Sequence, residues 1–315
     1  MPPIPIAVLL LLLLLLPQSS SFSYSIDENT HPDDDHHLSQ SDVDLLEFPL
    51  NLEFLEAEFF LFGSLGYGLD KVNPNLTNGG PPPKGAKLAR LDPVTQDIIS
   101  QFAFQEVGHL RAIQKTVKGI ARPQLDLSKK TFAQVVDKAF GRKLYPRFDP
   151  YANSINYLIA SYLIPYVGLT GYVGALPKLN APDSRKLVGG LLGVESGQDA
   201  IIRGMLYERA ALTVVPYGIR VGVFTNKISE LRNKLGGEGV KDEGLFVRKE
   251  QGPEGKSRGN VLAGDKDSLS YGRTPEEILR IVYGSGNETT PGGFFPKGAN
   301  GHIAQSHLKT NATHN

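Results

Sequence analysis

The sequence predicts an all-α protein, in which four long helices form a bundle and an irregular extension rich in Gly and Pro follows them. Apolar residues repeat at the helical period in four segments, and the bundle-facing sides of these segments carry polar residues at matching depth. Elsewhere, many of the 34 Gly and 22 Pro residues interrupt regular structure. We therefore divide the 315 residues into a signal peptide (1–22), a flexible acidic lead-in (23–43), the bundle (44–212) and a C-terminal extension with short helices (213–315).

The amino-terminal segment carries an apolar run at residues 6–16, with eight consecutive leucines from Leu9. A run of about 11 residues is too short to cross a bilayer but fits the core of a signal peptide. We therefore expect cleavage and secretion, and no membrane anchor elsewhere. Secretion would make three Asn-x-Thr sites available for N-glycosylation, at Asn75, Asn287 and Asn311.

The first predicted helix spans residues 45–65. Its apolar stripe consists of Leu46, Leu50, Ala57 and Phe60. Glu53 falls inside this stripe, and a carboxylate facing a core costs several kcal/mol unless it is paired, hydrogen-bonded or bound to a metal. Glu56 is a second candidate on a neighbouring face, whereas Glu58 is expected to meet solvent.

The second predicted helix, residues 92–117, begins at Asp92-Pro93, an N-cap followed by a residue suited to the first helical turn. Glu106 and His109 stand three residues apart, so both project from one face, which is otherwise apolar. A Glu-x-x-His pair turned inward can offer a metal one carboxylate oxygen and one imidazole nitrogen.

The third and fourth predicted helices complete the bundle. The third begins at Asp149-Pro150, is apolar nearly all round and bends at Pro165. The fourth runs from Asp183 to about residue 211, and its inward stripe contains Glu195 and Gln198 at the spacing of Glu106 and His109. Two helical hairpins with inward polar residues at matching depth indicate a four-helix bundle.

The extension contains two further helical signals. A helix over about 226–235 ends at Gly236-Gly237, and Thr274 with Glu277 forms a capping box before an apolar run. The two aromatics Phe294 and Phe295 are expected to pack against the bundle. Residues 302–315 carry little apolar surface, so we expect them to add little stability.

At these residues the chain resembles the ferritin-like superfamily, and in particular the secreted plant desiccation-related proteins. The bundle carries the first resemblance. The runs Thr274-Pro-Glu-Glu-Ile-Leu-Arg-Ile-Val-Tyr-Gly284 and Gly292-Gly-Phe-Phe-Pro-Lys-Gly298 carry the second. The resemblance implies accumulation on drying and residence outside the cytoplasm, in the cell-wall space or a vacuole, without implying a demonstrated reaction.

Di-iron members of that superfamily carry one Glu on each of two helices and Glu-x-x-His on each of the other two. Carried over, the resemblance implies the ligand set Glu53, Glu106, His109 and Glu195. Two positions depart from the family pattern: the third-helix carboxylate falls at Pro165, with Tyr166 beside it, and the fourth-helix imidazole falls at Gln198. Neither Pro nor an amide replaces those ligands adequately.

Histidine positions limit the site independently of any family. Of the seven His residues, only His109 lies in the predicted bundle, so a centre with two imidazoles is excluded unless the tail folds back. The four polar side chains could hold a single Fe, Mn or Zn ion. They could equally satisfy one another by hydrogen bonds with Gln198, Tyr162 or Tyr166. The interpretation favoured here is the metal-free cluster, with no cofactor.

Composition narrows the function. Lys and Arg (33) balance Asp and Glu (33), so no overall charge attracts nucleic acid, and the absence of Cys excludes thiolate chemistry. We favour a secreted, non-catalytic protein that protects against desiccation or stress. The alternative is a metal-dependent (Fe/Mn) oxidoreductase or metal-binding protein that limits reactive oxygen. A third hypothesis is contact with cell-wall polysaccharide through some of the 12 Tyr and 15 Phe residues.

Overall fold

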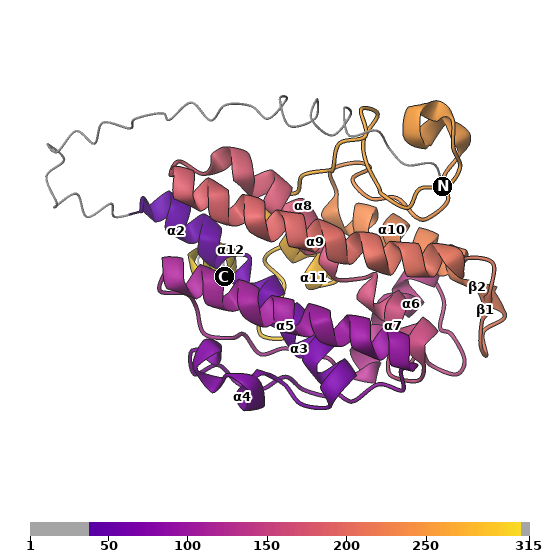
Figure 1. The fold of residues 1–315 in the computed structure, drawn as a ribbon, viewed down its shortest axis with the longest axis horizontal. Helices are drawn as coiled ribbons and strands as arrows, with labels where there is room; N and C mark the ends of the chain where they lie inside the picture. The colour runs from indigo at the N-terminus through magenta and orange to yellow at the C-terminus, as the bar shows by residue number, and fades with distance from the viewer. Residues whose placement is uncertain (1–37, 310–315) are drawn as a thin grey trace, which may run out of the picture. The chain divides into compact units, whose positions relative to one another are not determined.

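Four long helical segments form a bundle in the computed structural model, which describes residues 38–309. They are α3 (Leu50–Leu65), α5 (Pro93–Thr116), α7 (Ser154–Ser161) with α8 (Pro165–Ala175), and α9 (Pro182–Glu208). Helix α3 packs chiefly on α5, and α8 packs chiefly on α9 (Figure 1). The predicted all-α bundle is confirmed. The predicted signal peptide, residues 23–37 of the lead-in and Asn311 lie outside the described residues.

Helix α2 (Gln40–Glu47) begins inside the segment predicted as lead-in, so residues 40–43 belong to the folded part. Its Asp42 is buried and accepts hydrogen bonds from the backbone N–H groups of Asn180 and Ala181, each at 2.9 Å. Burial alone would raise the pKa of Asp42, but the N–H groups of Ala181 and Asn180 outweigh it and lower the pKa to about 2. These contacts hold α2 against the start of α9.

The third bundle segment is interrupted where the sequence predicts a bend. Helix α7 begins at Ser154 with Asn153 as N-cap, later than the predicted Asp149, and α8 begins at Pro165 after a short break. Pro165 has no N–H to continue the hydrogen-bond ladder of α7. By length and composition the stretch Ser154–Lys178 could cross a membrane, but 78% of its most apolar window is buried inside the protein. That burial is typical of a core helix.

The connection between α3 and α5 contains α4 (Leu69–Val72) and the 3₁₀ turn η1 (Pro74–Thr77). The prediction that Glu58 meets solvent is wrong: its side chain is fully buried and pairs with the buried Arg122. Arg122 also reaches Asp70, at 2.9 Å, and the carbonyl oxygen of Pro81, at 2.8 Å. One buried guanidinium therefore ties two loops to α3.

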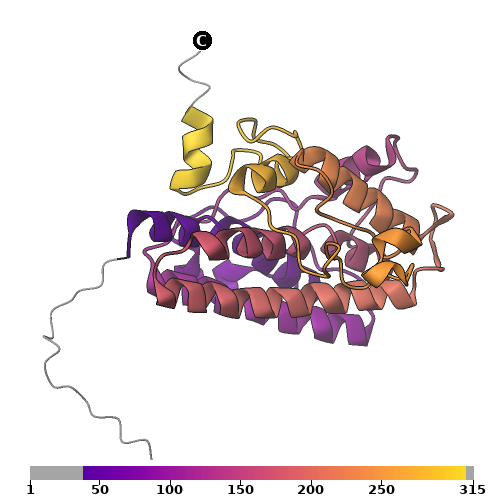
Figure 2. The same ribbon diagram turned by 90° about the horizontal axis from the view of Figure 1, so that it is seen from above.

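Much of the rest of the chain covers the side of the bundle away from α5 and α9 (Figure 2). Its elements are α6 (Lys129–Phe140), the strands β1 (Thr213–Val214) and β2 (Ile219–Arg220), α10 (Val221–Gly236), α11 (Pro275–Val282) and α12 (His302–Lys309), with the 3₁₀ turns η2 (Leu176–Lys178), η3 (Lys249–Gln251) and η4 (Pro253–Gly255). The predicted capping box of Thr274 and Glu277 is confirmed. Phe294 and Phe295 are buried as predicted, and the Phe294 ring lies 5.1 Å from that of Phe132.

Helix α12 contradicts the expectation that the tail adds little. It contacts α2 and α11. His302 Nδ1 lies 2.7 Å from an Asp44 oxygen, and Ala304 is fully buried. The described part of the tail is therefore packed on the bundle.

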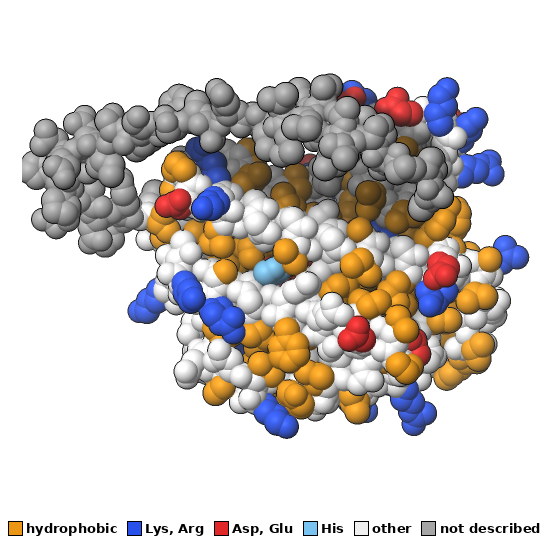
Figure 3. Space-filling model, viewed as in Figure 1, with side chains coloured by type: hydrophobic (Ala, Val, Ile, Leu, Met, Phe, Trp, Pro, Cys, Tyr) orange, Lys and Arg blue, Asp and Glu red, His pale blue; other side chains and the backbone are white. Residues whose placement is uncertain are grey.

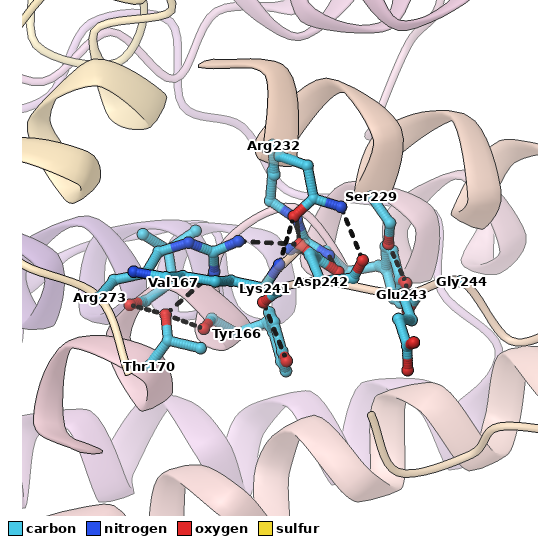
Figure 4. A network of polar contacts seen from close by, with 12 residues as sticks. Tyr166, Val167, Thr170, Ser229, Arg232, Lys241, Asp242, Glu243, Gly244 and Arg273 are labelled. Atoms are coloured by element: carbon cyan, nitrogen blue, oxygen red, sulfur yellow. Dashed lines mark hydrogen bonds and ion pairs between the residues drawn. The ribbon is translucent and has the colours of Figure 1, made fainter. Parts of the chain in front are cut away.

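A buried ionic network joins the extension to the bundle. Arg232 of α10 pairs with Asp242, with Nε 2.5 Å from Oδ2, and Arg273 approaches the same oxygen at 3.7 Å. Figure 4 shows Arg232 and Arg273 converging on Asp242 beside α8. All three side chains are buried, so one carboxylate compensates two guanidinium groups in the core.

Candidate metal centre

Four polar side chains predicted from the sequence converge inside the bundle. Helix α3 supplies Glu53, α5 supplies Glu106 and His109, and α9 supplies Glu195. One ligand atom of each lies within 4.8 Å of those of the others. The three carboxylates are at most 2% exposed and His109 is 7% exposed. Each of these residues falls on the inward face of its helix, where the neighbouring positions at the helical period are apolar.

The Nδ1 atom of His109 is the centre of the cluster. It lies 3.1 Å from Glu53 Oε2, 3.2 Å from Glu106 Oε2 and 3.5 Å from Glu195 Oε1. A ring nitrogen carries at most one hydrogen, so it can donate to only one of these three carboxylates at a time.

Burial and mutual repulsion determine the protonation of the cluster. Burial opposes charge on His109, but the Glu53 carboxylate and hydrogen bonds to Glu106 and Glu195 outweigh it, so the pKa of His109 is raised. Burial likewise opposes charge on Glu53, yet His109 lowers its pKa. Burial and the Glu195 and Glu53 charges hold the pKa of Glu106 well above its usual range, and burial raises the pKa of Glu195 to about 7. Without a cation the cluster must therefore retain protons.

Two neutral side chains complete the contacts of the cluster. Gln198 Nε2 donates to Glu106 Oε1 at 2.5 Å, and the Tyr172 hydroxyl of α8 donates to Glu53 Oε1. The sequence had suggested Tyr162 and Tyr166 for this role. Instead, their hydroxyl groups bond to the extension, Tyr162 to Ser229 and Tyr166 to the carbonyl oxygen of Lys241. Tyr172 was missed because every side of this helix is apolar and no stripe marks its inward face.

Gly168 of α8 also faces the carboxylates, three residues after Pro165, where the sequence pattern places the missing carboxylate. A Cβ at residue 168 would lie 3.1 Å from Glu56 Oε1 and 3.7 Å from Glu195 Oε2. At this position helix α8 therefore contributes no side chain to the cluster, whereas the family pattern has a carboxylate on this helix. Glu56, 1% exposed, extends into this space from α3.

Several oxygens of the cluster are left without partners. Among the described residues, Glu56 Oε2, Glu195 Oε2 and Gln198 Oε1 are buried and make no hydrogen bond, and Glu106 Oε2 and Glu195 Oε1 share the single atom His109 Nδ1 as a polar neighbour. Buried polar atoms are rarely left this way, because each costs about 1–3 kcal/mol. Carboxylate oxygens and one imidazole nitrogen are donors that suit Fe, Mn or Zn. The residues present therefore fit a bound cation.

A recess of about 30 Å³ reaches the cluster between α2, α3, α8 and α11. Its lining includes Glu53, Gly168, Gly171 and Tyr172. This volume suits one molecule of about the size of water. Only a small substrate could approach the carboxylates by this route.

The outer face of α9 above the cluster is rich in glycine. Gly189, Gly190, Gly193, Gly197 and Gly204 have no atom of another described segment within 4 Å of where a Cβ would stand. The other exposed side chains between residues 187 and 206 are Val194, Ser196 and Ile201, none of them charged. Figure 3 shows this face in the orientation of Figure 1, in which α9 and α5 cross the middle of the molecule.

Comparison with known proteins agrees with this geometry. The family model of the ferritin-like domain matches residues 41–208, which run from α2 to the end of α9. The desiccation-related protein PCC13-62 of Craterostigma plantagineum is 61% identical over 271 residues, covering 86% of each chain. The ferritin-like catalase Nec2 of Nesocodon mauritianus is 55% identical over 275 residues, covering 87% of this chain and 88% of the relative. No solved structure gives a significant match.

Proposed function

Because this chain belongs to the ferritin-like family, and within it to the plant desiccation-related proteins, we propose that it is a metal-binding stress protein that consumes hydrogen peroxide. The observation that carries the proposal is the convergence of three buried carboxylates on the single atom His109 Nδ1, which can donate at most one hydrogen to them. Glu53, Glu106, His109 and Glu195 would hold the ion. The name of the relative Nec2 supports peroxide as the substrate.

The reaction requires two electrons and two protons to pass between two peroxide molecules. One H₂O₂ loses both and leaves as O₂, and the other gains both and leaves as two H₂O. A bound Fe or Mn ion would supply the change of oxidation state. The chain would supply a water-excluding core around that ion and a recess of about 30 Å³ that reaches Glu53 and admits only small molecules.

A non-catalytic protective role remains the second candidate. The non-catalytic role is favoured by Gln198, which stands where the family pattern has a histidine ligand. Its side-chain amide donates a hydrogen bond to Glu106 without a metal. The Tyr172 hydroxyl also satisfies one Glu53 oxygen without a metal. In this reading the cluster is held by protons and hydrogen bonds alone, and the protein acts through its stability on drying.

Metal analysis of protein purified without a His tag separates the two candidates. We expect at least one equivalent of Fe or Mn per chain and oxygen release from peroxide. His109→Ala should reduce both by more than tenfold, because the only imidazole of the cluster is lost. His302→Ala is the matched control, since this imidazole is exposed and pairs with Asp44, which is not a member of the cluster, and it should keep both. A wild-type protein that stays metal-free and inert after incubation with Mn²⁺ and Fe²⁺ would support the non-catalytic role.

Secretion into the cell wall or vacuole is part of the proposal and rests on the leucine run at residues 9–16. We expect protein made in plant cells to begin after that run, as amino-terminal sequencing would reveal. Asn75 and Asn287 are exposed and open to glycan attachment, and peptide mass spectrometry would detect it there and at Asn311. A mature chain that still begins at Met1 would contradict secretion.

We further propose that the protein has no nucleic-acid partner and no membrane anchor. Contact with wall polysaccharide remains a separate hypothesis, which a polysaccharide pull-down would test.

A further inference from the structure

We propose that the cavity between α3, α6, α8, α10 and α11 is a binding site for an apolar molecule that carries one carboxylate, of the fatty-acid class. The cavity has a volume of about 290 Å³. None of the four residues Glu53, Glu106, His109 and Glu195 lines it, so the inference does not depend on the proposed metal centre.

The walls of the cavity are largely apolar. Leu52 and Leu55 of α3 and Val167 of α8 line it, together with aliphatic side chains from α10 and α11. Leu55 and Val167 are 1% exposed, so this part of the wall lies deep in the protein. Interior voids much larger than a water molecule are rare in folded proteins, and aliphatic walls give water few hydrogen-bond partners. A large cavity with such walls is therefore typical of a ligand site.

The mouth of the cavity is polar and lies on α6. Gln134 and Lys138 line the cavity and are both exposed, in contrast to the buried side chains of α3 and α8. They stand four residues apart, so they project from the same face of the helix. Lys138 Nζ donates to the carbonyl oxygen of Gly284, and it forms no ion pair with any residue between 38 and 309. The side chain of Gln134 makes no hydrogen bond within the same range.

The charge of the lining selects the head group of the ligand. The lining contains two cations, Lys138 and Arg232, and no Asp or Glu. Arg232 is paired with Asp242, whose Oδ2 lies 2.5 Å from Nε, so a ligand has little to gain from this guanidinium. Lys138 is the cation that a ligand can meet, and the Gln134 amide can donate beside it. A carboxylate fits both donors, whereas an amine would be repelled.

Isothermal titration calorimetry of the full chain with decanoate and with decylamine tests the inference. The two molecules share one apolar chain and differ in the charge of the head group. We expect one decanoate per chain and binding of decylamine that is about tenfold weaker, the effect of one hydrogen bond to a charged group. Lys138→Gln should weaken decanoate binding by about the same factor and bring the two affinities close together. Lys130→Gln, a change at an exposed lysine of α6 outside the cavity, should bind decanoate as the wild type does.

A variant that fills the cavity gives a second test. Val135 is half-buried on α6 and lines the cavity. Val135→Trp should place an indole in this space and abolish decanoate binding. Since the chain has no Trp of its own, the fluorescence of the new indole reports whether its surroundings are apolar. Val94→Trp, at a valine of α5 that is 66% exposed, is the matched control and should bind decanoate normally.

Three results would overturn the inference. The absence of decanoate binding in the wild type would remove the ligand site, as would binding that persists when a folded Val135→Trp protein buries its indole. Equal binding of decanoate and decylamine, unchanged in Lys138→Gln, would overturn the assignment of a carboxylate. The wild type and Lys138→Gln decide the inference even where circular dichroism shows that Val135→Trp does not fold. The proposed metal centre is tested separately, by metal content.

Discussion

Asp242→Asn should lower the free energy of unfolding by about 3–5 kcal/mol, the usual result of removing one partner from a buried ion pair. The substitution keeps the size of the side chain and removes its charge. Arg232 and Arg273 would then face each other in the core, at contacts that are now 2.5 Å and 3.7 Å from Asp242 Oδ2. Since this network joins α10 and the segment before α11 to the bundle, we expect the loss to destabilise the whole domain.

Urea unfolding followed by circular dichroism measures this effect. The matched control is Asp267→Asn, which removes the same charge from a pair with Lys266 at the surface. Exposed pairs contribute about 0–1 kcal/mol, so the control should stay close to wild type. A change below about 1 kcal/mol in Asp242→Asn would mean that other contacts compensate the two guanidinium groups.

Metal-free protein should lose stability as the pH rises from 5 to 8. Burial and neighbouring carboxylates hold the pKa values of Glu56 and Glu106 well above the usual range, so the folded state keeps protons that the unfolded chain releases. Stability from such groups is complete below the unfolded pKa and is lost as the pH rises. Both groups therefore contribute to a progressive loss of stability over this range of pH.

The other charged members of the cluster do not reverse this trend. His109, with its raised pKa, acts in the same direction, and the lowered pKa of Glu53 matters only at acid pH. Melting temperatures measured with a chelator across this range provide the test. Added Mn²⁺ should flatten the dependence, because a cation takes the place of the protons. A melting temperature that rises steadily from pH 5 to 8 in the metal-free protein would contradict this account.

The sequence predicts the helices because apolar residues repeat at the helical period. It predicts four members of the cluster because they are polar residues within those apolar stripes. Glu53, Glu106, His109 and Glu195 interrupt apolar stripes, and the structure brings all four together. Metal binding by them stays a prediction.

The errors have different physical causes. Glu58 was placed in solvent because its partner, Arg122, lies 64 residues away in an irregular connection that no period describes. Gly168 was missed because its role is the absence of a side chain. The position of Glu56 beside the cluster could be recognised only once the space at Gly168 was known. The packing of α12 was missed because it rests on a few small contacts, such as the buried Ala304, that leave no apolar stripe in the sequence.

The glycines on the outer face of α9 also bear on how solvent reaches the buried cluster. Each glycine inside a helix lowers its stability by about 1 kcal/mol relative to alanine. Five lie on this one outer face, and within the described residues no neighbouring segment closes over them. Helix α9 is therefore held by its inner contacts more than by its own propensity, and brief local opening of its turns is easier than opening of α5. Since Glu195 lies in the middle of α9, such opening would expose this side of the cluster to solvent.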